Sequence, residues 1–204
     1  QALQALVQQG MAGAVLSKAE SAESVARVAQ ATGPACALVP LVESVAGLDA
    51  VDALAQAPQV ARLAFGHLDF QVDAGMQCDV EEAELLSVRM AIVLASRRAR
   101  RAQPVDGVTV DTRDADRTTT DTQRALRMGF GAKLCIHPAQ VAWVHSVFAP
   151  TPEAVARAQQ VQQAMETAQG GVCVLDGRMV DAPVWQLARQ TLQRHAWAQA
   201  RAAR

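Results

Sequence analysis

The feature that most constrains the fold of this chain is a repeated alternation of short apolar runs with segments of helical spacing. Five apolar runs read as strands, at residues 12–18, 36–43, 60–66, 105–110 and 132–136. Segments with helical spacing lie between them, at residues 21–31, 48–56, 82–102 and 119–128. Strands that are apolar on both faces and alternate with helices indicate a parallel sheet covered by helices. The pattern therefore predicts the α/β class.

Residues that start and stop helices support these boundaries. Ser21 opens the first helical segment, where its side-chain oxygen can accept a hydrogen bond from the first turn. Gly129 follows the last segment, where a residue with left-handed backbone commonly ends a helix. The sequence therefore predicts an N-cap at Ser21 and a C-cap at Gly129.

Two architectures satisfy the alternation, an open doubly wound sheet and a closed (β/α)8 barrel. An open nucleotide-binding sheet would carry a glycine-rich phosphate turn, and the sequence has neither GxGxxG nor GxxxxGK[ST]. Polar residues instead follow successive strands, on the rim where barrel enzymes place their chemistry. They are Lys18 and Glu20, Glu43, Asp69, Asp106 or Asp111, and His137. A full barrel takes about 250 residues, so either the last part of the chain adds irregular strands or the first units are absent.

Composition narrows the classes of function. The 19 basic and 20 acidic side chains give a net charge of -1, which provides no attraction toward nucleic acid or an anionic membrane. The four cysteines are far apart and form no CxxC pair, which favours free thiols in a reducing cytoplasm over disulfides or a zinc site. No apolar run approaches the roughly 20 residues that span a bilayer. We expect a cytoplasmic protein with no nucleic-acid or membrane partner.

Glu43 and Asp69 are the two acidic residues with the most suggestive spacing. They are about one strand-helix unit apart, so they are predicted to stand side by side at the ends of neighbouring strands. Two carboxylates with room left for water and a substrate suit Mg²⁺, which is seldom enclosed by protein ligands alone. The alternative is that each carboxylate caps the helix that follows it.

Longer motifs carry a resemblance to a known family. They are LVESVAGLDAV, RLAFGHLDF, GFGAKLCIHPAQV, VFAPTPEAVARAQQV and LDGRMVDAPVWQLAR. In order and spacing they make nearly the whole chain resemble the citrate lyase beta-subunit family of the HpcH/HpaI aldolase superfamily. The resemblance implies a (β/α)8 TIM barrel that usually trimerises. It also implies a magnesium-dependent lyase that makes or breaks a carbon–carbon bond beside a thioester.

The same resemblance sets expectations for the organisation of the chain. Family members carry two further strand-helix units at their amino-terminal end, one of which holds an arginine of the site. The resemblance implies that this chain begins after them. We therefore expect residues 1–150 to form a partial barrel that lacks its first two β/α units. Residues 151–204 are expected to form a C-terminal helical extension that packs on the barrel or on a neighbouring subunit.

The resemblance also assigns roles to residues. It implies that Glu43 and Asp69 ligate Mg²⁺, and that Asp181 in GRMVDAP is a catalytic carboxylate, which some family members supply from the neighbouring subunit. The alternative for Asp181 is an N-cap of the following helix, because Pro183 stands near its start. Lys18 matches the family pattern incompletely, since Ser17 replaces a proline. The expected substrate-binding residues are Lys18, Gly66, His67, Ile136, His137 and Pro138.

Three functions follow as expectations. The first is a Mg²⁺-dependent lyase that cleaves a 3-hydroxyacyl thioester, such as citryl-, malyl- or citramalyl-CoA, into a 2-oxo acid and an acetyl thioester, or that catalyses the reverse reaction. The second is a pyruvate-type class II aldolase, and the third is a noncatalytic relative that binds metal and thioester. The acyl group could be carried by coenzyme A or a carrier protein. A homotrimer, or a hexamer of paired trimers, is the expected assembly.

One basic run left two interpretations open. Arg97, Arg98, Arg100 and Arg101 end a long predicted helix. They could meet the phosphates of coenzyme A, but basic residues at that place already complement the dipole of the helix.

Overall fold

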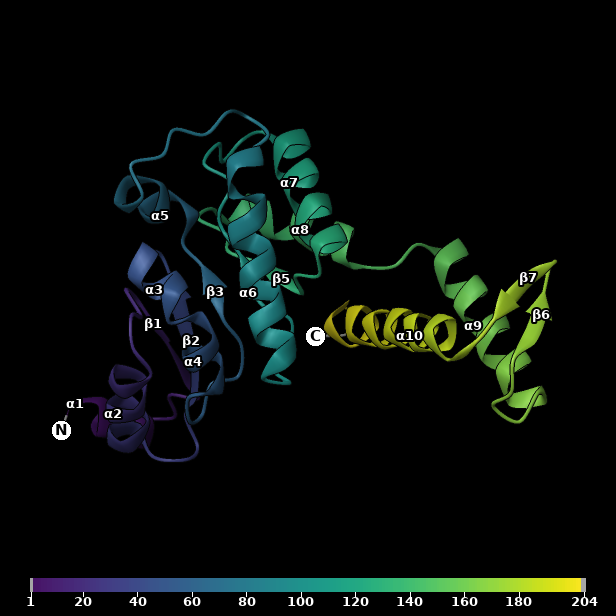
Figure 1. Ribbon diagram of the computed structural model, residues 1–204, viewed down its shortest axis with the longest axis horizontal. Helices are drawn as coiled ribbons and strands as arrows, with labels where there is room; N and C mark the ends of the chain where they lie inside the picture. Colours follow the sequence, from purple (N-terminus) through teal and green to yellow (C-terminus); the bar gives the residue numbers. More distant parts are fainter. Residues whose placement is uncertain (1, 203–204) are drawn as a thin grey trace. The chain divides into compact units, whose positions relative to one another are not determined.

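The computed structural model describes residues 2–202 and divides into two compact units, Gln1–Val141 and Ala142–Arg204 (Figure 1). The elements of the first unit are α1 (Ala2–Gln8), β1 (Gly13–Leu16), α2 (Ala22–Thr32), β2 (Ala37–Val42), α3 (Val45–Asp49), α4 (Val51–Gln56), β3 (Ala64–Phe65), α5 (His67–Asp73), the 3-10 helix η1 (Ala83–Leu85), α6 (Leu86–Arg98), β4 (Val105–Asp106), α7 (Ala115–Met128) and β5 (Ala132–Lys133). Helix α8 (Pro138–Phe148) crosses the division, and α9 (Pro152–Thr167), β6 (Cys173–Leu175), β7 (Arg178–Val180) and α10 (Ala182–Ala202) follow.

The first unit is built on a sheet of five parallel strands in the order β1-β2-β3-β4-β5. Each strand lies beside the next one in the sequence, so every crossover moves across the sheet in the same direction. A doubly wound sheet reverses its strand order at a switch point, whereas a barrel wall does not. The prediction of the α/β class with a parallel sheet is confirmed, and closure into eight strands stays a prediction.

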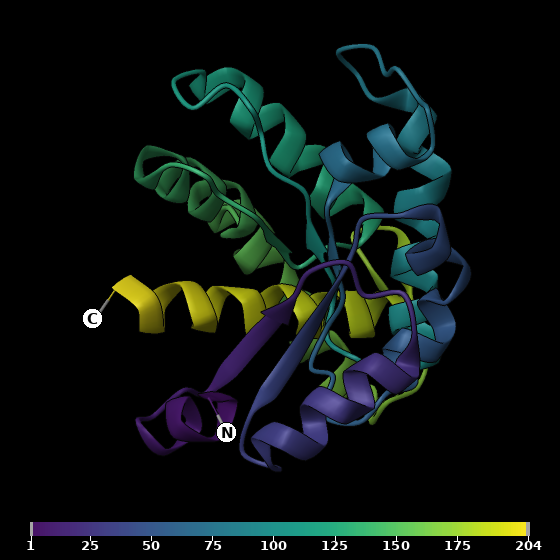
Figure 2. The same cartoon turned by 90° about the vertical axis from the view of Figure 1, so that its left-hand side faces the viewer.

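The core of the first unit lies between the strands and the helices that connect them. Side chains of α2, α4 and α6, such as Val25, Leu54 and Ile92, pack with Leu38 and Phe65 of the strands, and all of these are fully buried. Figure 2 shows β1 and β2 side by side, with the helices that follow them along one side. Burying one such side chain contributes roughly 1.5–3 kcal/mol.

Among residues 2–202, no helix has both the length and the apolar character needed to cross a membrane.

Element boundaries differ from the sequence predictions in instructive ways. The predicted caps are confirmed, because Ser21 accepts the N–H of Ser24 and Gly129 ends α7 with φ of 101°. The predicted strand at 60–66 is only two residues long in the structure, Ala64–Phe65, and helix α5 begins at His67. Asp69 therefore lies in the first turn of a helix that the sequence did not suggest, and not at the end of a strand.

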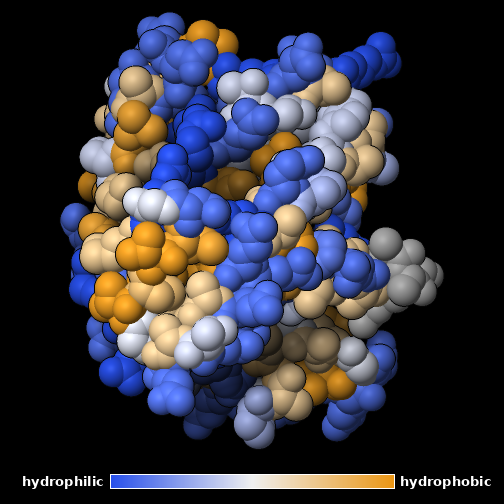
Figure 3. Space-filling model, turned by 90° about the vertical axis from the view of Figure 1, so that its right-hand side faces the viewer, coloured by the Kyte–Doolittle hydropathy of each residue, from blue (hydrophilic) through white to orange (hydrophobic). Residues whose placement is uncertain are grey.

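The second unit combines two helices with a hairpin. Helices α9 and α10 pack on each other through Ala158, Val161 and Ala188, and strands β6 and β7 pair antiparallel beside them. The turn of the hairpin is Asp176–Gly177, both with positive φ, as a two-residue hairpin turn requires. The sequence pattern described this segment as helical and gave no hairpin. The exposed hydrophobic residues of this unit include Val172, Val174, Met179 and Leu187. Figure 3 shows one face of the molecule, on which hydrophobic residues lie among hydrophilic ones.

Candidate functional site

The segments that follow the carboxyl ends of the five strands form one edge of the sheet, which we call the carboxyl edge. It comprises residues 17–20, 43–44, 66–69, 107–111 and 134–138. Backbone hydrogen bonds tie two of its segments to strand β2: the N–H of Ala19 donates to the carbonyl of Leu41, and the N–H of Gly66 donates to that of Val42 at 2.9 Å. The edge therefore brings together residues far apart in the sequence, as the predicted rim required.

Glu43 is the most enclosed carboxylate of this edge. Its residue is 7% exposed, and its Oε1 accepts the backbone N–H of Lys18 at 2.6 Å. A side chain at Gly66 would meet it, because a Cβ built there lies 2.7 Å from both Cβ and Oε2 of Glu43. Within residues 2–202, no lysine, arginine or histidine forms an ion pair with Glu43, although buried charges are normally paired or bound to metal.

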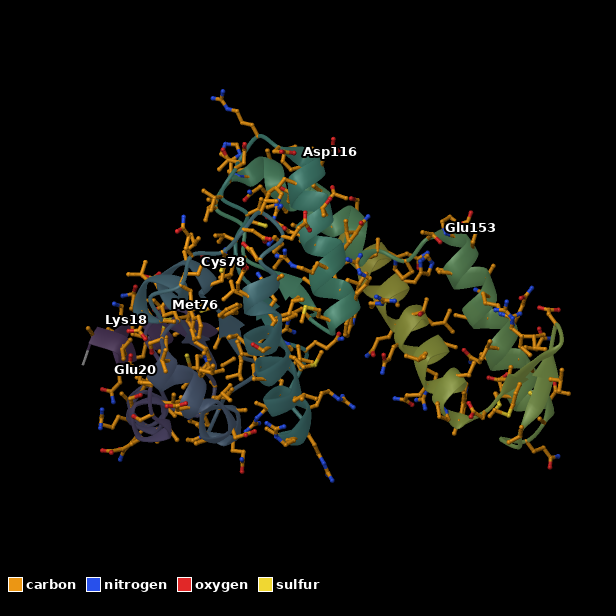
Figure 4. The ribbon with its side chains drawn as sticks, turned by 45° about the horizontal axis from the view of Figure 1, so that its top comes forward. Lys18, Glu20, Met76, Cys78, Asp116 and Glu153 are labelled. Carbon is orange, nitrogen blue, oxygen red and sulfur yellow. The ribbon has the colours of Figure 1, made fainter. Side chains whose placement is uncertain are left out.

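Lys18 and Glu20 occupy the turn after β1, as Figure 4 shows. Lys18 has φ of 47°, an uncommon conformation for a residue with a side chain, and this turn aims its N–H at Glu43. Glu20 accepts a hydrogen bond from the hydroxyl of Ser44 at 2.8 Å. Both side chains are exposed, so Lys18 contributes its backbone to the site and keeps its ammonium group in solvent.

Glu43 and Asp69 come after two neighbouring strands, β2 and β3. The register pairs Val42 with Phe65, so Glu43 stands beside Gly66. Asp69 follows three residues later in the first turn of α5 and is exposed. Among residues 2–202, no three His, Cys, Asp or Glu side chains gather as a metal cluster. Two carboxylates are nevertheless the protein share that Mg²⁺ usually takes, with water and substrate as its other ligands. The donor set fits that ion.

A second group of charges is largely buried, and we call it the buried ion network. Its members are Glu82, Arg89, Asp106, Asp121 and Arg124. Arg89 joins Asp106 at 3.0 Å and Glu82 at 2.5 Å, and it is 1% exposed. Arg124 joins Glu82 at 2.8 Å, and Asp121 accepts the hydroxyl proton of Thr109 at 2.8 Å. The network ties α6, α7 and β4 together by charge.

His67 connects the edge to this network. Its ring is 2% exposed, and Nε2 lies 3.3 Å from Oε1 of Glu82. Burial alone would raise the pKa of Glu82, but the hydrogen bond from His67 and the charge of Arg89 hold that pKa well below its ordinary value of 4.5. From the sequence, we expected His67 to bind substrate. In the structure, its Nε2 instead points toward Glu82 in the interior of the protein.

The side-chain amide of Gln140 holds the residues that follow β5 in place. Gln140 is 1% exposed; its Oε1 accepts the N–H of Ile136 at 3.0 Å, and its Nε2 donates to the carbonyl of Thr109 at 2.8 Å. Ile136, His137 and Pro138 are themselves exposed on the edge, where the sequence predicted them to meet substrate. Gln140 therefore fixes two neighbouring loops while these three residues face solvent.

The remaining acidic candidates have defined local roles. Asp106 is fully buried in the ion network, and Asp111 accepts the N–H of Arg113 and of Asp114 within its own turn. In the second unit, Asp181 accepts the N–H of Val184 at 3.2 Å and so caps α10. This hydrogen bond supports the capping alternative for Asp181 and leaves its catalytic role a prediction.

The basic run 97–101 lies at the opposite edge of the sheet. Arg98 pairs bidentately with Asp52, and Arg101 donates to the carbonyl of Ala55, both at α4. The N–H of Ala102 donates to Ala61, before β3, which is the amino end of that strand. These contacts agree with the helix-end interpretation and keep the run away from Glu43.

Sequence reasoning missed four residues that shape the site: Glu82, Gly107, Lys133 and Gln140. The motif GFGAKLCIHPAQV contains Lys133 and Gln140, so their presence in one motif was a usable signal. Lys133 is 8% exposed, its Nζ donates to the carbonyl of Gly107 at 2.6 Å, and burial lowers its pKa. Glu82 gave no signal in the sequence, because acidic residues crowd its segment.

The fold is that of an α/β protein with a parallel sheet, and Glu43 lies directly after its strand β2. A model of the family described as HpcH/HpaI aldolase/citrate lyase matches residues 1–138. The chain therefore belongs to this family, as its motifs indicated.

Named relatives give the family context. The chain is 31% identical over 192 residues to the citrate lyase subunit beta-like protein of Deinococcus radiodurans, covering 91% of this chain and 67% of that protein. It is 32% identical over 164 residues to the mitochondrial citramalyl-CoA lyase of Rattus norvegicus, covering 74% of this chain. Because that match covers 48% of the rat enzyme, the chain spans about half the length of this relative.

A solved structure with bound ligands is also similar to this chain. It is protein CitE from Mycobacterium tuberculosis in complex with magnesium, acetoacetate and coenzyme A. The TM-score is 0.79 at 28% identity, covering 95% of this chain and 73% of that one. The structural likeness thus extends over both units of the chain.

Proposed function

We propose that this chain carries the metal-binding edge of a Mg²⁺-dependent carbon–carbon lyase that acts on a 3-hydroxyacyl thioester. The observation that carries the proposal is Glu43, a carboxylate 7% exposed whose hydrogen-bond partner is the backbone N–H of Lys18. A buried carboxylate without a protein cation is costly unless a metal compensates it. Asp69 would supply the second carboxylate from the first turn of α5. The magnesium and coenzyme A in the related CitE structure support the same assignment.

The residues of the edge would perform distinct tasks. Bound Mg²⁺ would supply a Lewis acid that polarises the hydroxyl oxygen of the substrate. Glu43 and Asp69 would hold that ion, and Gly66 would keep space beside Glu43. Transfer of the hydroxyl proton to a water molecule and cleavage of the adjacent carbon–carbon bond would give a 2-oxo acid and a thioester enolate. Protonation of the enolate carbon then completes an acetyl thioester.

We propose that Asp181 of a neighbouring subunit donates that last proton, as in some members of the family that the sequence resembles. Its N-cap hydrogen bond to Val184 orients the carboxylate, and the resemblance assigns the position a catalytic role. Asn also caps helices well, so Asp181→Asn separates the two roles. We expect this variant to keep its stability and its Mg²⁺ affinity and to lose turnover. A native rate in Asp181→Asn would leave only the cap.

The substrate-facing part of the edge is proposed to be Lys18, Gly66, Ile136, His137 and Pro138. A thioester of citric, malic or citramalic acid on coenzyme A or a carrier protein fits the proposed chemistry, and the product would be a 2-oxo acid. We also propose that the five strands form part of a (β/α)8 barrel, and that the protein works as a trimer or a pair of trimers.

A panel of thioesters tests the proposed activity. Citryl-, (S)-malyl- and citramalyl-CoA are each incubated with the protein, with Mg²⁺ or with EDTA, and the released 2-oxo acid is measured. We expect Mg²⁺-dependent release from one member of the panel. Metal binding without release from any member would instead support a noncatalytic relative that binds metal and thioester.

A further inference from the structure

The first turn of α5 has few local means of holding its position. The helix is only seven residues long, and its N-cap, Gly66, provides no side-chain hydrogen bond. Helices this short are marginal unless tertiary contacts hold them. Asp69 lies in this turn, so the precision of the proposed metal site depends on contacts made elsewhere. The buried residues of α5 are His67 and Phe70.

His67 anchors the first turn of α5 through contacts on both sides of its ring. It is the first residue of α5 and 2% exposed. On one side, its Nε2 lies 3.3 Å from Oε1 of Glu82. On the other side, Gly107 approaches so closely that a Cβ built there would collide with Nδ1 of His67. The ring is therefore enclosed between an acid and a bare stretch of backbone.

Both sides of this enclosure are themselves fixed. Nζ of the buried Lys133 donates to the carbonyl of Gly107 at 2.6 Å, which holds the backbone wall in place. Glu82 is held by Arg89 at 2.5 Å and by Arg124 at 2.8 Å. We call Glu82, Gly107 and Lys133 together the His67 clamp.

The backbone of Glu82 indicates that its position is imposed. Its φ is 53°, in the left-handed region, which costs energy for a residue with a side chain and persists only where the surroundings enforce it. The loop that leads to it is anchored as well, because Met76 and Cys78 pack against the core, and Figure 4 shows where these two lie. The loop thus delivers the carboxylate of Glu82 to His67 against a local backbone preference.

We propose that Glu82 is a positioning residue of the metal site. By holding His67 against Gly107, it fixes the first turn of α5 and so the place of Asp69 relative to Glu43. This inference rests on the proposed function, because it assumes that Asp69 and Glu43 bind the metal. It assigns His67 a role inside the protein, two residues before the proposed ligand, in place of a contact with substrate.

The test compares two buried carboxylates of the same network by the dissociation constant for Mg²⁺, measured by titration calorimetry on the full chain. Glu82→Gln removes the charge that faces His67, and Asp121→Asn removes a charge that has no contact with His67. We expect the dissociation constant to rise about tenfold in Glu82→Gln, within the range for residues that orient metal ligands. Asp121→Asn is expected to stay within twofold of the wild type, although both variants lose stability.

A double-mutant cycle separates positioning from general weakening. If Glu82 acts through His67, then Glu82→Gln adds little to the loss of affinity already caused by His67→Gln, so the two effects are not additive. The effects of Asp121→Asn and His67→Gln should add. Should Glu82→Gln fail to fold, His67→Gln measured against Asp121→Asn decides the question, because it leaves both arginine partners of Glu82 in place.

Two results would overturn the inference. The first is an unchanged dissociation constant in Glu82→Gln or, if that variant does not fold, in His67→Gln. The second is an equal loss of affinity in Asp121→Asn. Failure of the proposed function gives a different result. If the wild type binds no Mg²⁺, or if Glu43→Gln binds Mg²⁺ with the same affinity as the wild type, then there is no metal site at this edge and no positioning role for Glu82.

Discussion

Glu43 and Glu82 are carboxylates of the same unit, both largely withdrawn from solvent, yet their partners differ. Glu82 lies against Arg89, Arg124 and His67, so its charge is balanced inside the protein. Glu43 accepts a hydrogen bond from the neutral backbone N–H of Lys18. Buried charges that the protein balances serve its structure, whereas one that it leaves unbalanced creates a demand for a cation. This contrast distinguishes the buried ion network from the carboxyl edge.

The largest effect on stability is expected when the network loses its central cation. Arg89→Met leaves Glu82 and Asp106 buried without their shared guanidinium, and breaking a buried pair from one side costs about 3–5 kcal/mol. Urea denaturation followed by circular dichroism measures the loss. Destabilisation below about 1 kcal/mol, the scale of a surface ion pair, would mean that the network is not the structural element we describe.

A crowding substitution should affect the edge more selectively. Gly66→Ala places a Cβ 2.7 Å from Glu43, so the carboxylate must shift, and we expect weaker Mg²⁺ binding together with about 1–3 kcal/mol of overpacking strain. Gly131→Ala is the matched control, because its Cβ meets Gln103 at 2.8 Å and not the site. If both variants reduce Mg²⁺ affinity equally, Gly66 has no special relation to the metal.

Acid should weaken the network through Glu82. Because its pKa is held below the ordinary 4.5 by His67 and Arg89, against the effect of burial, its contribution to stability is present above pH 4.5. That contribution is lost as the pH falls toward the lowered pKa. The difference in free energy of unfolding between the wild type and Glu82→Gln should therefore shrink as the pH falls below 4.5. A difference that stays constant through this range would contradict the ionic role of Glu82.

The smallest effect is expected at a solvent-exposed pair. Arg98 and Asp52 are 56% and 52% exposed, and exposed pairs contribute about 0.2–1 kcal/mol. Asp52→Asn should therefore change the free energy of unfolding by no more than that amount and leave Mg²⁺ binding unchanged. A larger loss would show that exposure alone does not separate weak ion pairs from strong ones in this protein.

Local patterns were enough to predict the framework of the fold. Ser21 and Gly129 acted within a few residues of themselves, and the apolar runs marked the parallel strands. Asp69 was placed wrongly at a strand end, because the apolar residues of 60–70 serve a two-residue strand and then the buried side of α5. The hairpin of the second unit did have a signal, the Asp176–Gly177 pair, which is typical of a two-residue turn.

The candidate site was predicted only where a local sequence pattern marked its residues. Glu43 follows an obvious strand, and family motifs marked it. The partners of Glu82, in contrast, come from α5, α6 and α7, and no local pattern connects them. A position that depends on tertiary contacts and on a left-handed backbone becomes visible only when the chain is folded.

The most direct test of the central claim is Mg²⁺ binding to the wild type and to Glu43→Gln, measured by titration calorimetry in the same buffer, with Asp52→Asn as the control. Gln keeps the size of Glu43 and can still accept the N–H of Lys18, so the fold should be retained. We predict that the wild type and Asp52→Asn bind Mg²⁺ and that Glu43→Gln loses detectable binding with no loss of stability. Equal binding by wild type and Glu43→Gln would contradict the claim that this edge is a metal site.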